Sequence, residues 1–345
     1  AKGYTYAPID FTSSLDNNRI KAHITIEDPN LKGTFILSYK PNMNDRVDID
    51  LRVDSIAPGK LNLTNSPDNT ISFTLDGEYN NYGNGNSRMN AKIQNLIVDN
   101  GEKRNEVRNI HIHDDRSEEQ HILLFNSDIL DCNIIGEFEY STLLKGVHDI
   151  FAGHFINRSK ESNRIVPGNN SYTFRLGIRN SGILNEIFNL PASINEYSTI
   201  KGECSEKDGI FRINADINNA SITNGIYRSI KLDGYTDNNE ITLAVEAVKP
   251  IIRNKKDFNY SNTDNDLVIK LNSLYSNDSI TSKVKWENGN TGRKIKGALG
   301  VNAEIRQSLE GIPYISAIIN PDSIIHNDSL WFVSAGSIKG NLKRI

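Results

Sequence analysis

Apolar and polar residues alternate along most of the chain. Between residues 47 and 53 the alternation is strict, because Val47, Ile49, Leu51 and Val53 are each separated by a charged residue. Residues 71–75, 172–178, 211–217, 241–247 and 267–271 show a similar period of two. This period is typical of a β-strand with one buried and one solvated face. The pattern therefore predicts an all-β chain of many short strands.

Turn-forming residues separate these segments. Gly, Asn and Asp cluster at residues 83–86, 99–101, 208–209 and 288–289, and such clusters favour turns between strands. Helical spacing of apolar residues occurs at residues 142–155 and, in a shorter stretch, at 183–190. We therefore expect a mostly antiparallel sheet with one or two short helices, and residues 1–345 show no clear internal boundary.

Seven segments share the pattern of an apolar residue, one spacer and a glycine. They end at Gly33, Gly77, Gly136, Gly202, Gly234, Gly297 and Gly340. Glycine inside a strand often marks a bulge or a bend. The intervals between the seven are unequal, so they do not define a solenoid repeat. They predict a sheet that bends repeatedly.

The apolar side of so many strands needs a cover. Leaving one large apolar side chain in water forfeits roughly 1.5–3 kcal/mol, and over about twenty strands the loss exceeds the net stability of any domain. A second sheet could cover this side, the sheet could close into a barrel, or it could curl into an elongated trough around something other than protein. In the trough interpretation the inner face is lined by Ile49, Leu51, Ile71, Phe73, Phe174, Leu176, Ile213, Ile241, Leu243, Val245, Ile269 and Leu271. Some of these residues could instead be ordinary core.

Composition narrows the class of partner. The 39 basic and 43 acidic residues give a formal charge of −4 and form no basic stripe, so we do not expect nucleic-acid binding. The mean hydropathy is −0.48, and no apolar run approaches the ~20 residues that span a bilayer. Residue 1 is Ala, which suggests a processing site or a fragment boundary, so we expect any anchor to lie outside this chain. Cys132 and Cys204 form no metal or disulfide motif, and we interpret them as buried free thiols.

Residues that could carry chemistry are few. His111, His113 and Asp115 would share one face of a strand, but the same spacing is expected of ordinary solvated positions. Four carboxylates, those of Asp128, Asp131, Glu137 and Glu139, could be read as a glycosidase pair, yet charges spaced by two on strands are usually solvent-facing. No nucleophile elbow or phosphate loop is present. We therefore expect no catalytic residues, no metal and no cofactor.

Several stretches resemble TamB-type proteins of the AsmA-like superfamily, in the version found in Bacteroidota. The segment NSDILDCNIIGEF, residues 126–138, followed by a helix at 143–155, resembles a segment common in that family. Residues 28–33, Asp-Pro-Asn-Leu-Lys-Gly, resemble a strand nearer the start of such segments, and residues 324–331 resemble a recurring strand that ends in Trp. Together these stretches span nearly the whole chain, although their motifs are structural rather than catalytic.

The resemblance implies a U-shaped "β-taco" sheet whose apolar trough carries phospholipid between the inner and outer membranes. TamB-type proteins are anchored in the inner membrane by an N-terminal helix, cross the periplasm and meet an outer-membrane barrel protein through a C-terminal domain; some assist outer-membrane protein assembly. This chain would be an internal periplasmic fragment of such a non-enzymatic protein, because neither the anchor helix nor the C-terminal domain is recognisable in it. Two alternatives from other classes are a polysaccharide-active enzyme on a parallel β-helix and a structural or adhesive β-sandwich with a dry core.

Overall fold

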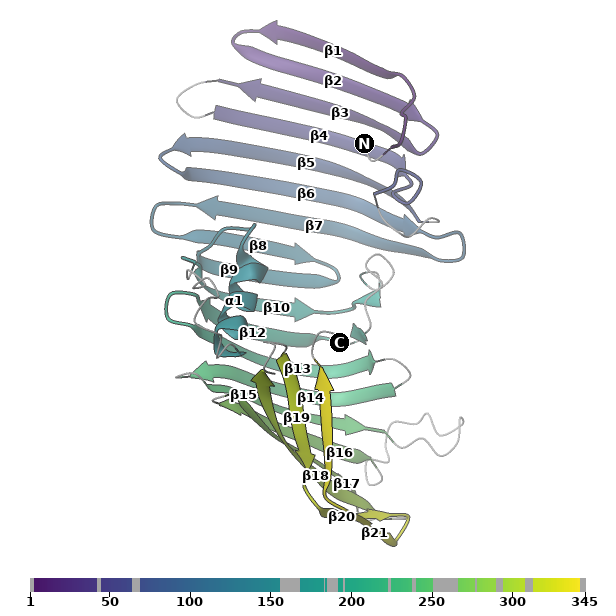
Figure 1. Cartoon of the computed structure of the whole chain (residues 1–345). Helices are drawn as coiled ribbons and strands as arrows, with labels where there is room; N and C mark the ends of the chain where they lie inside the picture. The colour runs from purple at the N-terminus through teal and green to yellow at the C-terminus, as the bar shows by residue number, and fades with distance from the viewer. Residues whose placement is uncertain are drawn as a thin grey trace. The chain divides into compact units, whose positions relative to one another are not determined.

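The computed structural model of the chain consists almost entirely of strands (Figure 1). It describes residues 3–41, 45–63, 69–155, 168–182, 184, 192–194, 196–222, 225–237, 240–250, 266–276, 278–289, 294–307 and 313–341. Within these residues there are 22 strands and one α-helix, and the strand pairs given below are all antiparallel. The predicted fold class, an all-β chain built as an antiparallel sheet with few helices, is confirmed.

The chain divides into two compact units. The first sheet unit comprises Ala1–Glu137 and Phe174–Ser193, and the second comprises Phe138–Thr173 and Ile194–Ile345. The division passes through strand β10 (Ser171–Ile178) and beside the short strand β11 (Ala192–Ile194). The expectation of one continuous segment stays a prediction.

The first sheet unit is a meander of long strands, each paired with the next in the chain. Tight turns make this possible; Asn17 and Asn18, for example, both adopt the left-handed conformation that a two-residue hairpin requires. Its strands are β1 (Ile9–Asp16), β2 (Arg19–Asp28), β3 (Leu31–Lys40), β4 (Asp45–Ile56), β5 (Thr70–Gly83), β6 (Asn86–Asp99), β7 (Arg104–Arg116), β8 (His121–Ser127) and β9 (Leu130–Glu137).

The second sheet unit also begins as a meander, from β12 to β19. At its C-terminal end the order changes, because β18 also pairs with β20 and β19 pairs with β22. The sheet of this unit curls towards its yellow C-terminal strands (Figure 1). Its strands are β12 (Ser198–Ser205), β13 (Ile210–Ile222), β14 (Gly225–Asp237), β15 (Glu240–Lys249), β16 (Leu267–Ser276), β17 (Ser279–Asn288), β18 (Ile295–Gln307), β19 (Pro313–Ile319), β20 (Asp322–His326), β21 (Ser329–Val333) and β22 (Gly336–Asn341).

The repeated glycines have more than one structural role. Gly33 does lie at a register shift, between Lys32 and Gly33 on β3, as the bulge interpretation expects. Gly297 lies in regular register opposite Trp286, and a Cβ at Gly297 would come 2.4 Å from the indole ring. That glycine therefore makes room for a large cross-strand neighbour rather than bending the sheet.

The predicted helix at 142–155 is present as α1 (Leu143–Phe155). Its first turn closes with a hydrogen bond from the Gly146 amide to the Thr142 carbonyl, and the Thr142 hydroxyl donates to the Glu139 carbonyl. Lys145 and Asp149 form an ion pair one turn apart on its exposed side. The second predicted helix, residues 183–190, lies almost wholly outside the described residues.

Candidate functional site

One face of the first sheet unit is apolar from β1 to β9. Residues directly opposite each other in antiparallel strands share a face, so the register identifies it. Ile49 is opposite Leu37 and Gly77, and Leu51 is opposite Phe35 and Leu75. Phe73 pairs with Val53, and Ile71 with Ile56 and Val98. The structure thus places all four predicted residues of this unit, Ile49, Leu51, Ile71 and Phe73, on one surface, which we call the first apolar face.

The second sheet unit has an equivalent surface. Leu243 is opposite Gly234 and Ser273, and Gly234 is opposite Ile213. Val245 and Ala247 follow Leu243 on β15 by two and four residues. Val245 is opposite Leu271, and Ala247 is opposite Ile269. All six predicted residues of this unit, Ile213, Ile241, Leu243, Val245, Ile269 and Leu271, therefore lie on what we call the second apolar face.

The remaining two predicted residues belong to β10. Phe174 and Leu176 alternate with Thr173 and Arg175, so they share a strand face with Tyr172. Tyr172 is buried, and its hydroxyl donates to the Leu143 carbonyl of α1 across 3.5 Å. Phe174 and Leu176 themselves are half-buried. At this strand the residue in contact with α1 is Tyr172, which the sequence interpretation did not include in the trough.

Much of the first apolar face is accessible to solvent. Ile49 and Leu37 are each 39% exposed, and Phe11 on β1 is 62% exposed. The other eleven predicted residues are half-buried, and none of the twelve is fully buried. An isolated apolar residue on a surface is ordinary, but this surface is continuous across neighbouring strands. Large continuous apolar surfaces usually bind something.

Part of the first apolar face forms a closed core. Val98, Val107 and Ile110 are almost fully buried and pack against half-buried neighbours that include Ile71 and Leu96. Strand β6 has one extra residue here relative to β5, because the pairing shifts between Ser72 and Thr74 of β5. Asn95 of β6 adopts a left-handed conformation at this point, with φ of 53°. This bulge keeps Ile93 and Leu96 on one side although three positions separate them. The predicted residue Ile71 therefore lies at the margin of a packed cluster rather than in open surface.

In the second sheet unit, helix α1 covers part of the apolar face. Its Phe151 ring packs edge-on against Phe211 of β13 with 5.2 Å between ring centroids, and Ile150 is only 6% exposed. Phe211 precedes Ile213 by two residues and therefore lies on the second apolar face. The sequence interpretation expected helices to cover only a local patch, and α1 does this at β13.

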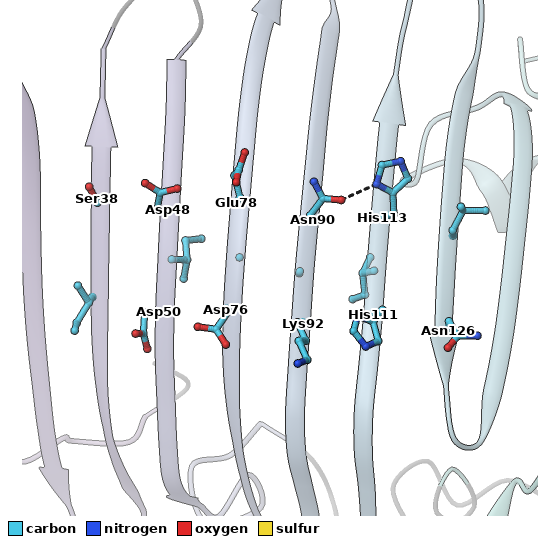
Figure 2. A pocket seen from close by; sticks show the side chains of 16 residues that line it. Ser38, Asp48, Asp50, Asp76, Glu78, Asn90, Lys92, His111, His113 and Asn126 are labelled. Carbon is cyan, nitrogen blue, oxygen red and sulfur yellow. Dashed lines mark hydrogen bonds between the residues drawn. The ribbon is translucent and has the colours of Figure 1, made fainter.

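The opposite side of the first sheet unit is polar and holds an open groove of about 750 Å³ (Figure 2). Two rows of side chains cross β4 to β7 there. In the first row Arg46 bonds both Asp48, at 2.8 Å, and Glu78, at 3.1 Å, and Asn90 contacts His113 at 2.7 Å. The second row contains Asp50, Asp76, Lys92 and His111, none of which has a hydrogen bond or ion pair within the described part of the chain.

Two members of the histidine motif on this polar side, His113 and Asp115, have structural partners. His113 Nδ1 contacts the Asn90 Oδ1 atom, and Asp115 accepts two bonds from Arg88, at 3.0 and 2.6 Å. Among the described residues, no three His, Cys, Asp or Glu side chains are grouped so that they could hold a metal ion.

Two of the four carboxylates considered as a glycosidase pair, those of Asp128 and Asp131, have partners in the protein. Asp131 forms an ion pair with Arg179 at 2.5 Å and accepts a bond from Asn126. Asp128 accepts a hydrogen bond from the backbone amide of Arg108 at 3.2 Å. Both carboxylates therefore hold neighbouring segments of the chain together.

The two cysteines are free. Cys204 is 2% exposed, and burial raises the pKa of its thiol. Burial likewise raises the pKa of the Tyr172 hydroxyl beside it. Cys132 is only half-buried, so the expectation of two buried thiols is met by Cys204 alone. The raised pKa of Cys204 makes a reactive thiolate unfavourable.

Several residues of the apolar faces were missed by the sequence interpretation. Phe35, Leu37 and Tyr39 alternate on β3 and lie beside the predicted residues of β4. Ile9 and Phe11 alternate on β1 and lie opposite Ile26 and Ile24 of β2. The signal was present in the alternation of residues 33–39, which Ile36 on the polar side partly conceals.

Comparison with known proteins leaves the family open. No protein-family model, curated protein or solved structure matches the chain. Within the described residues, no helix has the length and apolarity that spanning a bilayer requires. The candidate site therefore rests on the geometry of the two apolar faces.

Proposed function

We propose that the apolar faces bind the acyl chains of phospholipids, and that the chain is a non-enzymatic, periplasmic segment of an envelope-spanning lipid-transport protein. The observation that supports this proposal is the asymmetry of the first sheet unit. Its apolar side is continuous over nine strands and includes Ile49 and Leu37 at 39% exposure, whereas its other side is covered by charged and amide groups.

Acyl chains suit such a surface physically. Each methylene removed from water contributes roughly 0.8 kcal/mol, and no directed polar contact is required. The predicted lining residues are aliphatic or Phe, and the row through Leu243 also includes Gly234 and Ser273. The space above Gly234 is taken up by Ile213 and Leu243, whose methyl carbons would lie 3.1 and 3.5 Å from an added Cβ. A long, one-sided apolar surface of this kind suits a flexible chain better than a rigid polar substrate.

The envelope context comes from the resemblance to TamB-type proteins. On that basis the segment conducts phospholipid between the inner and outer membranes, and other segments of the same protein supply the inner-membrane anchor and the contact with an outer-membrane barrel protein. The antiparallel pairing of the described strands, such as β4 with β5 and β14 with β15, differs from the parallel coils of a β-helix. The polysaccharide-enzyme alternative depends on that fold.

Lipid extraction from the purified chain tests the proposal. We expect near-stoichiometric phospholipid by mass spectrometry, and its loss from a Leu243→Asp/Val245→Asp variant. The matched control is Thr242→Asp/Thr281→Asp, which adds the same charge to the opposite side, where Leu274 is paired with both residues across the strands. A well-folded parent without lipid would overturn the proposal and favour a dry β-protein.

A further inference from the structure

The polar side of the first sheet unit carries a block of four carboxylates on β4 and β5. Asp48 and Asp50 follow each other on the polar side of β4, directly opposite Glu78 and Asp76 of β5. Figure 2 shows these four side chains together on two neighbouring strands. Like charges directly opposite each other in a sheet are destabilising, so this acidic block has an electrostatic cost within the molecule.

The protein offsets the charge of only one of the two carboxylate pairs. The Arg46 guanidinium lies 2.8 Å from Asp48 and 3.1 Å from Glu78. Asp50 and Asp76 are both exposed, and among the residues that the structure describes neither has a hydrogen bond or an ion pair. The Arg46 pair shows what these two carboxylates lack, which is a cationic group within reach of both.

The polar side of the second sheet unit carries a basic block of the same layout. Lys283 and Lys285 follow each other on the polar side of β17, and Lys285 is directly opposite Lys270 of β16. Lys270 forms an ion pair with Glu246 at 2.9 Å. Lys283 and Lys285 are exposed, and within the described strands neither has a hydrogen bond or an ion pair. Two ammonium groups are thus left over in the second unit, and two carboxylates in the first.

The two blocks match in spacing and in reach. Residues two apart on a strand lie ~6.8 Å from each other, and opposite residues of antiparallel strands lie about 4.5–5.5 Å apart. Both blocks are built on this spacing. Asp50 and Asp76 line an open groove of about 750 Å³ with short side chains, whereas a lysine carries its ammonium group on a flexible four-carbon stem. Lysines of a facing sheet can therefore reach into the groove and meet both carboxylates.

We propose that these two surfaces form an interface between copies of this chain, in which the acidic block of one copy binds Lys283 and Lys285 of a second copy. Each copy carries both surfaces, so the contact is head-to-tail and continues into rings or open chains. Both surfaces lie on the polar sides of their sheets, so the interface leaves the apolar faces uncovered. This association is therefore independent of lipid binding.

Charge reversal on the full chain tests the proposal, with self-association measured by sedimentation velocity over a range of concentrations. We expect the parent to associate reversibly, and less strongly at high salt. Asp50→Lys/Asp76→Lys and Lys283→Glu/Lys285→Glu each bring like charges together, so each variant alone is expected to self-associate at least about tenfold more weakly. An equal mixture of the two is expected to regain association, because every contact then joins a basic block to an acidic one.

The controls separate this contact from a general effect of charge. Each reversal changes the formal charge of −4 by four, to 0 or to −8, so net attraction does not explain association in the mixture. Asp10→Lys/Asp16→Lys makes the same change in net charge on the polar side of β1, and is expected to associate as the parent does. Asp50→Asn/Asp76→Asn removes the two charges without adding others, and is expected to weaken association by a smaller factor. Circular dichroism reports that each variant is folded.

Four results would overturn the proposal. The parent could remain monomeric at low salt, or a folded charge-reversed variant could associate as strongly as the parent. The mixture of two folded variants could fail to regain association, which would show that the two blocks do not face each other. The Asp10→Lys/Asp16→Lys control could weaken association as much as the reversal at Asp50 and Asp76, which would show that net charge alone is responsible.

Discussion

The two sheet units present the same kind of apolar face but cover it differently. In the second unit, α1 places Phe151 against Phe211, which is only 8% exposed. In the first unit, a bulged cluster around Val98 and Val107 closes one part of the face, while Ile49 and Leu37 remain 39% exposed. Alternation along a strand thus determines which side is apolar, and a separate element determines how much of it is available.

The largest expected effect comes from the covered position. Phe211→Ala removes a buried ring beneath Phe151, so we expect the free energy of unfolding to fall by about 3–5 kcal/mol. Phe73→Ala removes a half-buried ring from the first apolar face and should cost less than about 2 kcal/mol. Urea unfolding followed by circular dichroism compares the two. Equal losses would contradict the distinction between covered and open surface.

A smaller contrast is expected between two glycines of the apolar faces. A Cβ at Gly297 would lie 2.4 Å from Trp286 Cζ2, whereas a Cβ at Gly77 would lie no closer than 3.5 Å to any neighbour. Gly297→Ala should therefore displace the indole and cost about 1–3 kcal/mol, with a red shift of tryptophan emission. Gly77→Ala should cost below about 1 kcal/mol and leave the emission unchanged. An unshifted spectrum for Gly297→Ala would show that the indole does not rest on this glycine.

The smallest expected effect concerns the non-strand segment that packs on each unit, which is α1 in the second unit and residues 4–7 in the first. In the second unit the contact is apolar, through α1; in the first, residues 4–7 are held by the Asp28 carboxylate. The Tyr4 hydrogen bond holds the pKa of Asp28 below its usual range, with burial acting in the opposite direction. Because the folded pKa is lowered, the stabilisation is present above the ordinary pKa of 3.8 and is lost as the pH falls through the folded value.

Hydrogen exchange measures this local effect. We expect the Ala7 and Asn30 amides, which both donate to Asp28 at 2.8 Å, to lose protection on acidification before the β13–β14 amides do. Asp28→Asn should remove most of that pH dependence. If these amides kept their protection below the folded pKa of Asp28, the ionised carboxylate would not be what holds the segment.

The sequence predicted the local features of the fold well. Alternation placed all ten predicted residues of β4, β5, β13, β15 and β16 on the apolar faces, and helical spacing placed α1. These signals are short-range, because successive residues of a strand point to opposite faces and the face of each residue follows from its position along the strand.

Long-range features could not be predicted in the same way. The bulge at Asn95 changes the parity within β6 through a backbone conformation, φ of 53°, that interrupts the alternation. The docking of Phe151 on Phe211 joins residues 60 positions apart.

Photolabelling with a diazirine-bearing phospholipid tests the central claim most directly. After irradiation of the intact chain with the probe, peptide mass spectrometry identifies the labelled residues on β4 and β15. The account predicts labels at Ile49, Leu51, Leu243 and Val245, competed away by unlabelled phospholipid, and none at Asp48, Asp50, Thr242 or Ala244 on the opposite side. Equal labelling of both parities, or labelling that does not compete, would contradict a lipid-binding apolar face.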